Sequence, residues 1–361
     1  MANRDVIVVG ASAGGVEALR ELVAGLPPDL PATVLVVLHV PETGRSALPA
    51  ILTRAGPLPA RHPVDGQRLR RGEILVAPPN HHLTVLDGMA RLTHGPRENG
   101  HRPAIDPLFR AVARWHGPRV IGVVLSGTLD DGTAGQVAIA AEGGLVLVQD
   151  PEDALYGTMP LSVLEHLKVD HVAPARALGA LLGRLVREPL AVAPSCGGPV
   201  PEPTEETALV DPTTGPAGDP SGNLPGDPSG NLPGDPAGLG CPQCGGSLYA
   251  IEDPRLVRYR CRVGHVWSPE SLLAEQSEAL ESALWMALRT LEDRAALCRR
   301  CEQSATVRGH RTTVERYRSQ AEESEQAARV MRDALERAQR ATRLVVDDGD
   351  GPIPSDTGPP R

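Results

Sequence analysis

The chain has 361 residues, enough for about two domains, and only 2% of them are aromatic. Its net charge of −9 is concentrated in residues 191–240, which hold 7 acidic groups and no basic one, so both flanking regions are near neutral. Nothing in this distribution indicates a nucleic-acid-binding surface. No apolar run approaches 18 residues and no signal peptide precedes the first apolar run, so the sequence predicts a cytoplasmic protein that does not insert into a membrane.

A strand, a glycine-rich turn and a helix open the chain. Residues 6–9 are consecutive apolar β-formers, residues 10–15 carry the glycines, and residues 16–23 repeat apolar side chains at helical spacing. Ser12 is the middle residue of a G-x-S-x-G run, which lifts a hydroxyl to the carboxyl edge of a sheet. The same position suits a helix N-cap. The glycine spacing does not fit a dinucleotide-binding turn, so Ser12 is predicted to be either a nucleophile or a cap.

Strand and helix signals then alternate as far as residue 186, with one hairpin signal at Asp87-Gly88. This alternation predicts an α/β fold with a doubly wound, mostly parallel sheet, whose ligand site lies beyond the carboxyl ends of the strands. The further strands are predicted at 34–38, 73–77, 83–86, 90–93, 120–125 and 145–148, and the further helices at 107–115 and 135–141.

Three residues of catalytic type follow predicted strand ends, namely Ser12, His39 and Asp131. A serine becomes a nucleophile only with a base in reach, histidine suits that role, and a carboxylate fixes its tautomer. His39 also has an interpretation as a strand-end residue satisfied by backbone, Asp131 as a helix cap, and Asp130 is a rival carboxylate. We favour the catalytic interpretation because the three residues converge on one sheet edge.

Five runs of the sequence form a recognisable series, namely Gly10–Gly15, Leu38–Pro41, Ala77–His82, Gly100–Phe109 and Gly127–Gly132. In sequence and in order they resemble the catalytic domain of the chemotaxis protein-glutamate methylesterases, the CheB family. The resemblance implies that Ser12 is the nucleophile, His39 its general base and Asp131 the orienting carboxylate, and that His82 and His101 line the cleft.

This resemblance also implies an activity and partners. The predicted enzyme hydrolyses glutamate γ-methyl esters on methyl-accepting chemotaxis receptors, and glutamine deamidation is a second reaction of the family. The implied partners are methylated chemoreceptors and a receptor methyltransferase, with no nucleic acid and no catalytic cofactor. The alternative is a non-catalytic scaffold protein that uses a hydrolase-like domain and a zinc-helix module.

The sequence departs from the family pattern in three ways. Ala13 follows the predicted nucleophile where the family usually has Thr or Ser, and Gly127-Thr128-Leu129 replaces a usual Gly-Met-Gly. The usual N-terminal phosphoreceiver domain is absent from this sequence, which suggests a stand-alone form. We therefore assign residues 1–190 to the methylesterase-like domain alone.

Residues 191–240 contain an eight-residue Gly/Pro/Asp repeat and few apolar groups, which is typical of a flexible linker. A tether of this length gives only a millimolar-scale effective concentration. We therefore expect the region beyond the linker to be mostly undocked from the catalytic domain and to recruit the enzyme.

A zinc-binding module is predicted at residues 241–267. Cys241 and Cys244 form one close pair of ligands, and Cys261 and His265 form a second across a predicted hairpin. Two such pairs provide the tetrahedral ligands of a closed, structural zinc site. A rival interpretation takes the second pair from Cys298 and Cys301.

Two long amphipathic helices are predicted over residues 268–346. Ser268-Pro269 is a helix start with a serine cap, and Gly309 separates the two helices. Short connections favour an antiparallel hairpin, whose apolar stripe buries against itself, dimerises or receives a partner. Residues 347–361 are predicted to be a disordered tail.

Overall fold

The computed structural model describes residues 3–44, 46–190, 234–252 and 256–347. Two compact units divide the chain, Met1–Leu272 and Leu273–Arg361. The first unit contains the predicted catalytic domain and the cysteine-rich module, and the second contains most of the C-terminal helices. Most of the predicted linker, residues 191–233, and residues 348–361 of the predicted tail lie outside the described residues.

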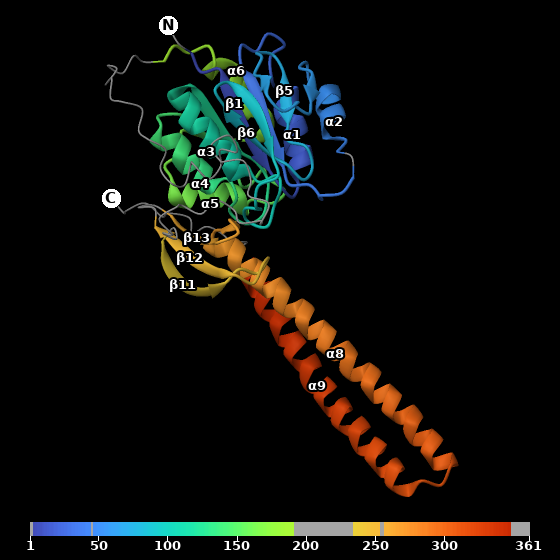
Figure 1. Ribbon diagram of the computed structural model, residues 1–361. Coiled ribbons are helices and arrows are strands. Elements are labelled where there is room, and N and C mark those ends of the chain that lie inside the picture. The colour runs from blue at the N-terminus through green and yellow to red at the C-terminus, as the bar shows by residue number, and fades with distance from the viewer. Residues whose placement is uncertain (1–2, 45, 191–233, 253–255, 348–361) are drawn as a thin grey trace, which may run out of the picture. The chain divides into compact units, whose positions relative to one another are not determined.

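A seven-stranded parallel sheet forms the centre of the catalytic domain (Figure 1). Alternate residues of its central strand point to opposite faces, so that Ile7 and Val9 join one apolar cluster and Val6 and Val8 join another. Both faces are buried, as expected for a strand of consecutive apolar residues. The prediction of a doubly wound parallel sheet is confirmed. In spatial order the strands are β10 (His171–Ala173), β9 (Leu145–Gln149), β8 (Val120–Val124), β1 (Val6–Ala11), β2 (Thr33–Leu38), β5 (Ile74–Val76) and β3 (Ala60–Arg61).

Helices cover both faces of this sheet (Figure 1). Their apolar side chains pack against the sheet and complete the apolar cluster on each face. Leu19, Leu22, Leu108 and Phe109 are fully buried. One face carries α1 (Gly15–Ala24), α2 (Leu48–Ala55) and α6 (Ala175–Leu185), and the other carries α3 (Ile105–His116), α4 (Thr133–Ala141) and α5 (Thr158–His166); a 3-10 turn spans Gly117–Arg119.

The strand order reverses its direction of growth between β1 and β8, which are neighbours in the sheet. This is the switch point at which open parallel sheets bind ligands, because the loops after the two strands diverge there. The loops after β1, β2 and β8 carry Ser12, His39 and Asp131. A second, three-stranded sheet belongs to the same domain, since Leu83, Val85 and Ala90 join one of its two apolar clusters. This sheet contains the predicted hairpin, in the order β4 (Gln67–Arg68), β7 (Met89–Thr93) and β6 (His82–Leu86).

The cysteine-rich module is a four-stranded antiparallel sheet with a very small apolar core. That core contains Cys241, Leu248, Cys261, Trp267 and Leu272. Residues 235–240, which the sequence analysis assigns to the linker, instead pair with the next strand, so the predicted boundary is wrong there. The strands are β11 (Asp235–Gly240), β12 (Ser247–Glu252), β13 (Val257–Cys261) and β14 (Val266–Trp267), in that order.

Two long helices follow, α8 (Pro269–Val307) and α9 (Arg311–Asp347). The serine cap is confirmed, because the Ser271 N–H donates to Ser268 Oγ at 3.1 Å. Gly309 adopts a φ of 71° in the turn between the helices. Arg299 pairs with Glu325 and Glu292 with Arg332, an order of pairing that requires antiparallel helices. No helix among the described residues has the length and apolar character to cross a membrane.

Candidate active site and candidate metal centre

Ser12 lies in the tight turn between β1 and α1. Its backbone N–H donates to the Ser126 carbonyl at 2.9 Å, and its own carbonyl accepts from the Gly15 N–H at 2.9 Å. Gly14 has a φ of 69°, and a Cβ there would lie 2.7 Å from Ser126 Oγ, so the turn requires glycine. The residue before α1 is Gly14, and no side chain caps that helix. The Ser12 hydroxyl is therefore not a cap and is free to contact His39.

His39 follows β2 and lies between the other two predicted residues. Its Nδ1 is 3.0 Å from Ser12 Oγ, and its Nε2 is 2.8 Å from Asp131 Oδ2. A carboxylate partner on Nε2 makes that nitrogen the donor, which leaves Nδ1 as the acceptor for the serine hydroxyl. The chymotrypsin triad uses the same chemistry with the two ring nitrogens exchanged.

Asp131 is buried and accepts hydrogen bonds at both carboxylate oxygens. Oδ2 accepts from His39 and from the Ile105 N–H at 2.7 Å, and Oδ1 accepts from the Asp106 N–H at 3.2 Å and from Asn99 Nδ2 at 3.3 Å. Burial raises the pKa of Asp131, but the His39 and Ile105 hydrogen bonds outweigh burial and hold the pKa below the usual range. Asp131 is therefore an ionised carboxylate at neutral pH.

Asp130, the rival carboxylate, faces away from His39. Its Oδ1 accepts from the hydroxyls of Ser268 at 2.7 Å and Ser271 at 3.0 Å. Burial raises the pKa of Asp130 to about 6, and the nearby charges of Glu270 and Asp131 add to that rise. The two adjacent aspartates thus have different partners, and of these two only Asp131 contacts the imidazole.

The histidines that the resemblance implies for the cleft have different environments. His101 stacks on His39, with ring centroids 3.7 Å apart and an interplanar angle of 17°. Burial and the neighbouring His39 lower the pKa of His101 to about 4, so it is neutral at pH 7. His82 is only 4% exposed and contacts backbone at both ring nitrogens, the Pro96 carbonyl and the Ala104 N–H. His101 lies at the candidate site, whereas His82 fastens the loop between β7 and α3.

Two further residues, Asp106 and Asn99, fix the position of Asp131 and of the loop that follows it, and the sequence analysis did not single them out. Asp106 Oδ1 accepts from the N–H groups of Gly132 at 3.0 Å and Gly135 at 2.7 Å, which fixes the start of α4 after Asp131. Burial, and then the charge of Asp131, raises the pKa of Asp106 well above its usual value. Asn99 donates to Asp131. Both positions fall in or beside the run Gly100–Phe109, but their roles depend on contacts with distant residues.

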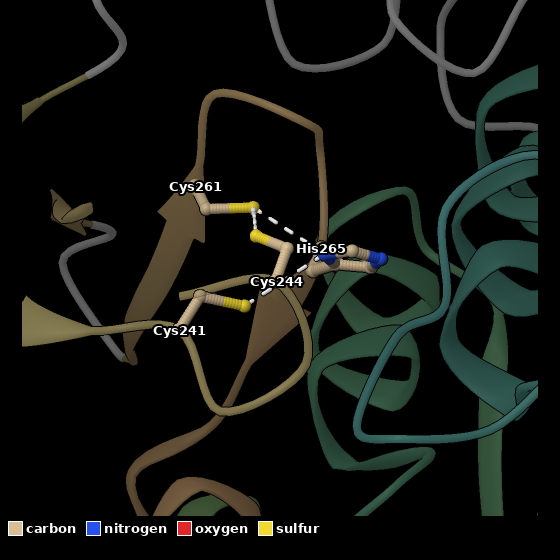
Figure 2. Close-up of side chains that lie close together, drawn as sticks. All are labelled: Cys241, Cys244, Cys261 and His265. Carbon is tan, nitrogen blue, oxygen red and sulfur yellow. Dashed lines mark hydrogen bonds between the residues drawn. The ribbon is translucent and has the colours of Figure 1, made fainter. Parts of the chain in front are cut away.

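The four predicted metal ligands converge on one point (Figure 2). The donor atoms of Cys241, Cys244, Cys261 and His265 all lie within 4.8 Å of one another. Cys244 Sγ is 3.6 Å from Cys261 Sγ, and His265 Nδ1 is 3.5 Å from Cys261 Sγ. A tetrahedral Zn²⁺ with Zn–S bonds of about 2.3 Å and a Zn–N bond of about 2.0 Å spaces its ligands about 3.5–3.8 Å apart. The four residues therefore fit a metal ion of this type.

The electrostatics of the cluster also favour a cation. Burial raises the pKa of Cys244 to about 11, and the nearby Cys261 and Cys241 sulfurs contribute to that rise. Burial likewise raises the pKa of Cys241, but the Trp267 indole and the Cys244 N–H outweigh it and lower the pKa overall. Three neighbouring thiols can ionise together only beside a compensating cation.

The rival pair, Cys298 and Cys301, is not part of this cluster. Among the described residues, the group that could hold a metal contains the other three cysteines and His265. Cys298 Sγ instead lies 3.9 Å from Gln320 Oε1, between α8 and α9. Cys196 lies outside the described residues.

The module is docked on the catalytic domain, contrary to the prediction of an undocked tail. Both belong to the unit Met1–Leu272. The Val266 N–H donates to the Arg97 carbonyl at 3.3 Å, and the Asn99 N–H donates to the Val266 carbonyl at 2.8 Å. The prediction of an undocked module considered only the entropy of the linker. It did not include the stabilisation from these backbone hydrogen bonds or from the bonds of Ser268 and Ser271 to Asp130.

A parallel α/β domain with a Ser–His–Asp series at the carboxyl edge of its sheet has the architecture of a serine hydrolase. Residues 7–182 of this chain match the family described as CheB methylesterase. This match confirms, for residues 7–182, the resemblance to the CheB methylesterases seen in the sequence.

Known relatives share this region. A protein-glutamate methylesterase/protein-glutamine glutaminase of Anaeromyxobacter dehalogenans is 37% identical over 186 residues, 52% of this chain and 54% of the relative. One of Methanosarcina mazei is 32% identical over 192 residues, 51% of this chain and 52% of the relative. The solved catalytic domain of Thermotoga maritima CheB methylesterase is 30% identical, with a TM-score of 0.49, and covers 52% of this chain and 100% of that domain. The chain spans about half the length of the curated relatives it matches.

Proposed function

We propose that this protein hydrolyses glutamate γ-methyl esters on methyl-accepting chemotaxis receptors. Ser12 is the nucleophile, His39 the general base and Asp131 the orienting carboxylate. The observation that carries the proposal is the hydrogen-bonded series Ser12 Oγ, His39 Nδ1, His39 Nε2 and Asp131 Oδ2. The printed names of the curated relatives support the same reaction class.

The chemistry proceeds in two balanced steps. Ser12 Oγ attacks the ester carbonyl carbon while its proton passes to His39 Nδ1, and Asp131 stabilises the imidazolium through Nε2–H. Collapse of the tetrahedral intermediate expels the methoxy group, which takes the proton from His39 and leaves as methanol. Water then attacks the acyl-enzyme with His39 as base, which yields the glutamate carboxylate and restores Ser12.

The oxyanion of the tetrahedral intermediate requires hydrogen-bond donors near Ser12. The N–H of Ser12 itself is engaged by the Ser126 carbonyl. We assign the role to the N–H of Ala13, which follows the nucleophile at the start of α1, where the helix dipole also favours negative charge. A backbone donor does not depend on the side chain, so alanine in place of the usual Thr or Ser retains it.

Glutamine deamidation is a second proposed reaction of the same site. The relatives named protein-glutamine glutaminase support it. An amide passes through the same acyl-enzyme and releases ammonia in place of methanol. The proposed protein partners are methylated chemoreceptors, and a receptor methyltransferase makes the esters that this enzyme removes. We place this reaction in the cytoplasm.

For the metal centre we propose a structural zinc ion held by Cys241, Cys244, Cys261 and His265. The ligand spacing and the three thiols support this choice. Four protein ligands leave no open position, so the ion supplies folding energy and no step of the ester hydrolysis.

The test of the proposed function is methanol release from receptor peptides that carry γ-methyl glutamate. Ser12→Ala should lower kcat/KM by at least about 10⁴-fold, because the serine acts as part of a unit. His39→Ala should do nearly the same, and Asp131→Asn should cost about 10²- to 10⁴-fold. The matched control is Ser46→Ala, since the Ser46 hydroxyl accepts from the Leu48 N–H at 3.3 Å, outside the site.

A non-catalytic scaffold is the competing function, and the same assay separates the two. A serine-directed fluorophosphonate should label wild-type protein at Ser12 and fail to label Ser12→Ala. A wild-type chain that binds receptor peptides but releases no methanol and takes no label would be a scaffold. Full activity in Ser12→Ala would refute the assigned mechanism.

A further inference from the structure

The side chain of Asn99 lies between the candidate catalytic carboxylate and the C-terminal module, a name used for the cysteine-rich sheet together with the first turn of α8 (residues 235–271). Nδ2 donates to Asp131 Oδ1 at 3.3 Å, and Oδ1 accepts from the Ser268 N–H at 2.9 Å. We propose that Asn99 is a positioning residue for Asp131 and that Val266 and Ser268 of the C-terminal module hold Asn99 in place. The proposal rests on the proposed function, because positioning matters only if Asp131 orients His39.

The orientation of the Asn99 amide follows from its two partners. The Ser268 N–H is a donor only, so it requires the amide oxygen, and an ionised Asp131 is an acceptor only, so it requires the amide nitrogen. A flipped amide would oppose like groups on both sides. The side chain is 7% exposed, so water does not readily replace either contact.

The backbone at Asn99 is held by the same module. Its N–H donates to the Val266 carbonyl at 2.8 Å, and Arg97 accepts from the Val266 N–H. Asn99 adopts a φ of 49°, a left-handed conformation that asparagine tolerates better than most residues. These bonds fix the loop from which the amide reaches Asp131.

A second link reaches the residue before Asp131. The hydroxyls of Ser268 and Ser271 both donate to Asp130 Oδ1. Ser268 thus contacts Asn99 through its N–H and Asp130 through its hydroxyl. The module therefore acts on Asp131 by two indirect routes, through its neighbour Asp130 and through Asn99, whose amide donates to the Asp131 carboxylate.

This arrangement assigns the module a role in catalysis and argues against a lid. Asp131 must keep Oδ2 on His39, and donors to Oδ1 resist rotation of the carboxylate. Oδ1 also accepts from the Asp106 N–H, and Oδ2 accepts from the Ile105 N–H and the imidazole; of these donors, Asn99 is the one that the module contacts. Val266, Ser268 and Ser271 bond to Arg97, Asn99 and Asp130 of the catalytic domain, and within the part of the chain that the structure describes no such bond reaches Ser12.

The test uses the full-length chain with its metal. Asn99→Gly removes the amide and keeps the left-handed backbone accessible, so it should lower kcat about tenfold, the value of one hydrogen bond to a charged group, with little change in KM. Asn99→Asp keeps the shape but sets a second carboxylate beside Asp131. It should lower kcat further and move the acid limb of the kcat/KM profile to higher pH, because added negative charge stabilises the imidazolium.

Variants of Ser268 and Ser271 test how much the module contributes to kcat. Ser268→Ala combined with Ser271→Ala should lower kcat about threefold to tenfold. Added to Asn99→Gly, it should cost less than the two losses multiplied, because the residues act as one unit. Ser277→Ala is the matched control, since its exposed hydroxyl bonds within α8 to the Leu273 carbonyl, and its activity should be unchanged.

A readout without turnover keeps this inference separate from the proposed function. The ¹H NMR resonance of His39 Nε2–H should shift or broaden in Asn99→Gly and stay unchanged in Ser277→Ala. If Ser12→Ala retains activity but the resonance responds as stated, the proposed function fails and the positioning role stands. Wild-type kcat together with an unchanged resonance in Asn99→Gly would overturn the positioning role. Faster turnover in the serine variants would show that the module is an inhibitory cover.

Discussion

The catalytic domain and the cysteine-rich module are stabilised in opposite ways. The catalytic domain packs two apolar clusters of 27 and 21 buried residues against the two faces of its sheet. The apolar cluster of the module contains 5 buried residues, and 2 of these are the cysteines Cys241 and Cys261. A core of the first kind supplies its own folding energy, whereas one of the second kind cannot offset chain entropy without a metal. We therefore expect the catalytic domain to fold without an ion and the module to depend on one.

The largest effect is expected when a metal ligand is removed, because the module should then unfold while the catalytic domain stays folded. In Cys241→Ser, bound zinc should fall from one per chain to none and the module should unfold, because a structural zinc ion contributes about 10 kcal/mol or more. The melting transition of the catalytic domain should remain. Elemental analysis and protease cleavage within residues 235–267 measure the two outcomes.

The matched control is Cys301→Ser, which removes a cysteine outside the cluster. It should keep one zinc per chain and an intact module. Loss of zinc in Cys301→Ser, or stoichiometric zinc at undiminished affinity in Cys241→Ser, would contradict the assigned ligands.

The converse variant weakens the apolar core and spares the metal. Val36 is fully buried in β2, and Val36→Ala should lower the free energy of unfolding of the catalytic domain by about 2 kcal/mol while zinc stays at one per chain. Val64 is 69% exposed in the same domain, and Val64→Ala should change stability by less than about 0.5 kcal/mol. If urea titrations gave equal losses in the free energy of unfolding for the two variants, burial of apolar side chains would not determine the stability of this domain.

The sequence predicted those features that depend on neighbours along the chain. Apolar runs and glycine turns predict β1, β2, β5, β8 and β9 of the parallel sheet to within a residue or two, but not the short edge strands β3 and β10. They also bring Ser12, His39 and Asp131 to one edge. The Cys/His spacing likewise predicts a ligand cluster. The two residues of each ligand pair are close in sequence, and a hairpin brings the two pairs together, so no distant contact is needed. Three helices of the catalytic domain were not predicted, namely Leu48–Ala55, Thr158–His166 and Ala175–Leu185.

Features that depend on distant contacts could not be predicted in this way. Asn99 meets Asp131, 32 positions away, and Ser268, 169 positions away, so no spacing in the sequence indicates its role. The strand Asp235–Gly240 consists of residues with poor β-propensity and forms only because its backbone pairs with β12. The linker composition likewise carries no information on whether the module docks.

The junction between the two regions should respond to pH through Asp130. Burial raises the pKa of Asp130 to about 6 in the folded protein, above the value of about 4 expected in an unfolded chain. The folded state therefore binds the proton more tightly, and this group's contribution to stability falls as pH rises from about 4 to about 6. Asp130→Asn keeps an acceptor for both serines without the charge. It should raise the free energy of unfolding at pH 7 by on the order of 2 kcal/mol.

The control for Asp130 is the pH itself, because at pH 4 the wild-type carboxyl is already neutral. Glu270 and Asp131 also face this group, and both remain in the variant. The difference in stability between the two proteins should vanish near pH 4 and grow towards pH 7. A difference that is constant with pH would mean that the substitution acts through packing and not through charge.

The smallest expected effect concerns strain that the catalytic domain stores beside the junction. Leu129 has a φ of 62°, in the left-handed region, where a branched side chain costs about 1–2 kcal/mol. Asparagine tolerates this conformation, as Asn80 and Asn99 do in the same domain, so Leu129→Asn should raise the free energy of unfolding by about 1 kcal/mol. Leu129→Gly should gain less, because glycine also adds entropy to the unfolded chain. Leu129→Ala is the decisive control in chemical denaturation: it retains the Cβ that causes the strain, so a gain equal to that of Leu129→Asn would trace the effect to the 37%-exposed apolar side chain and not to the backbone.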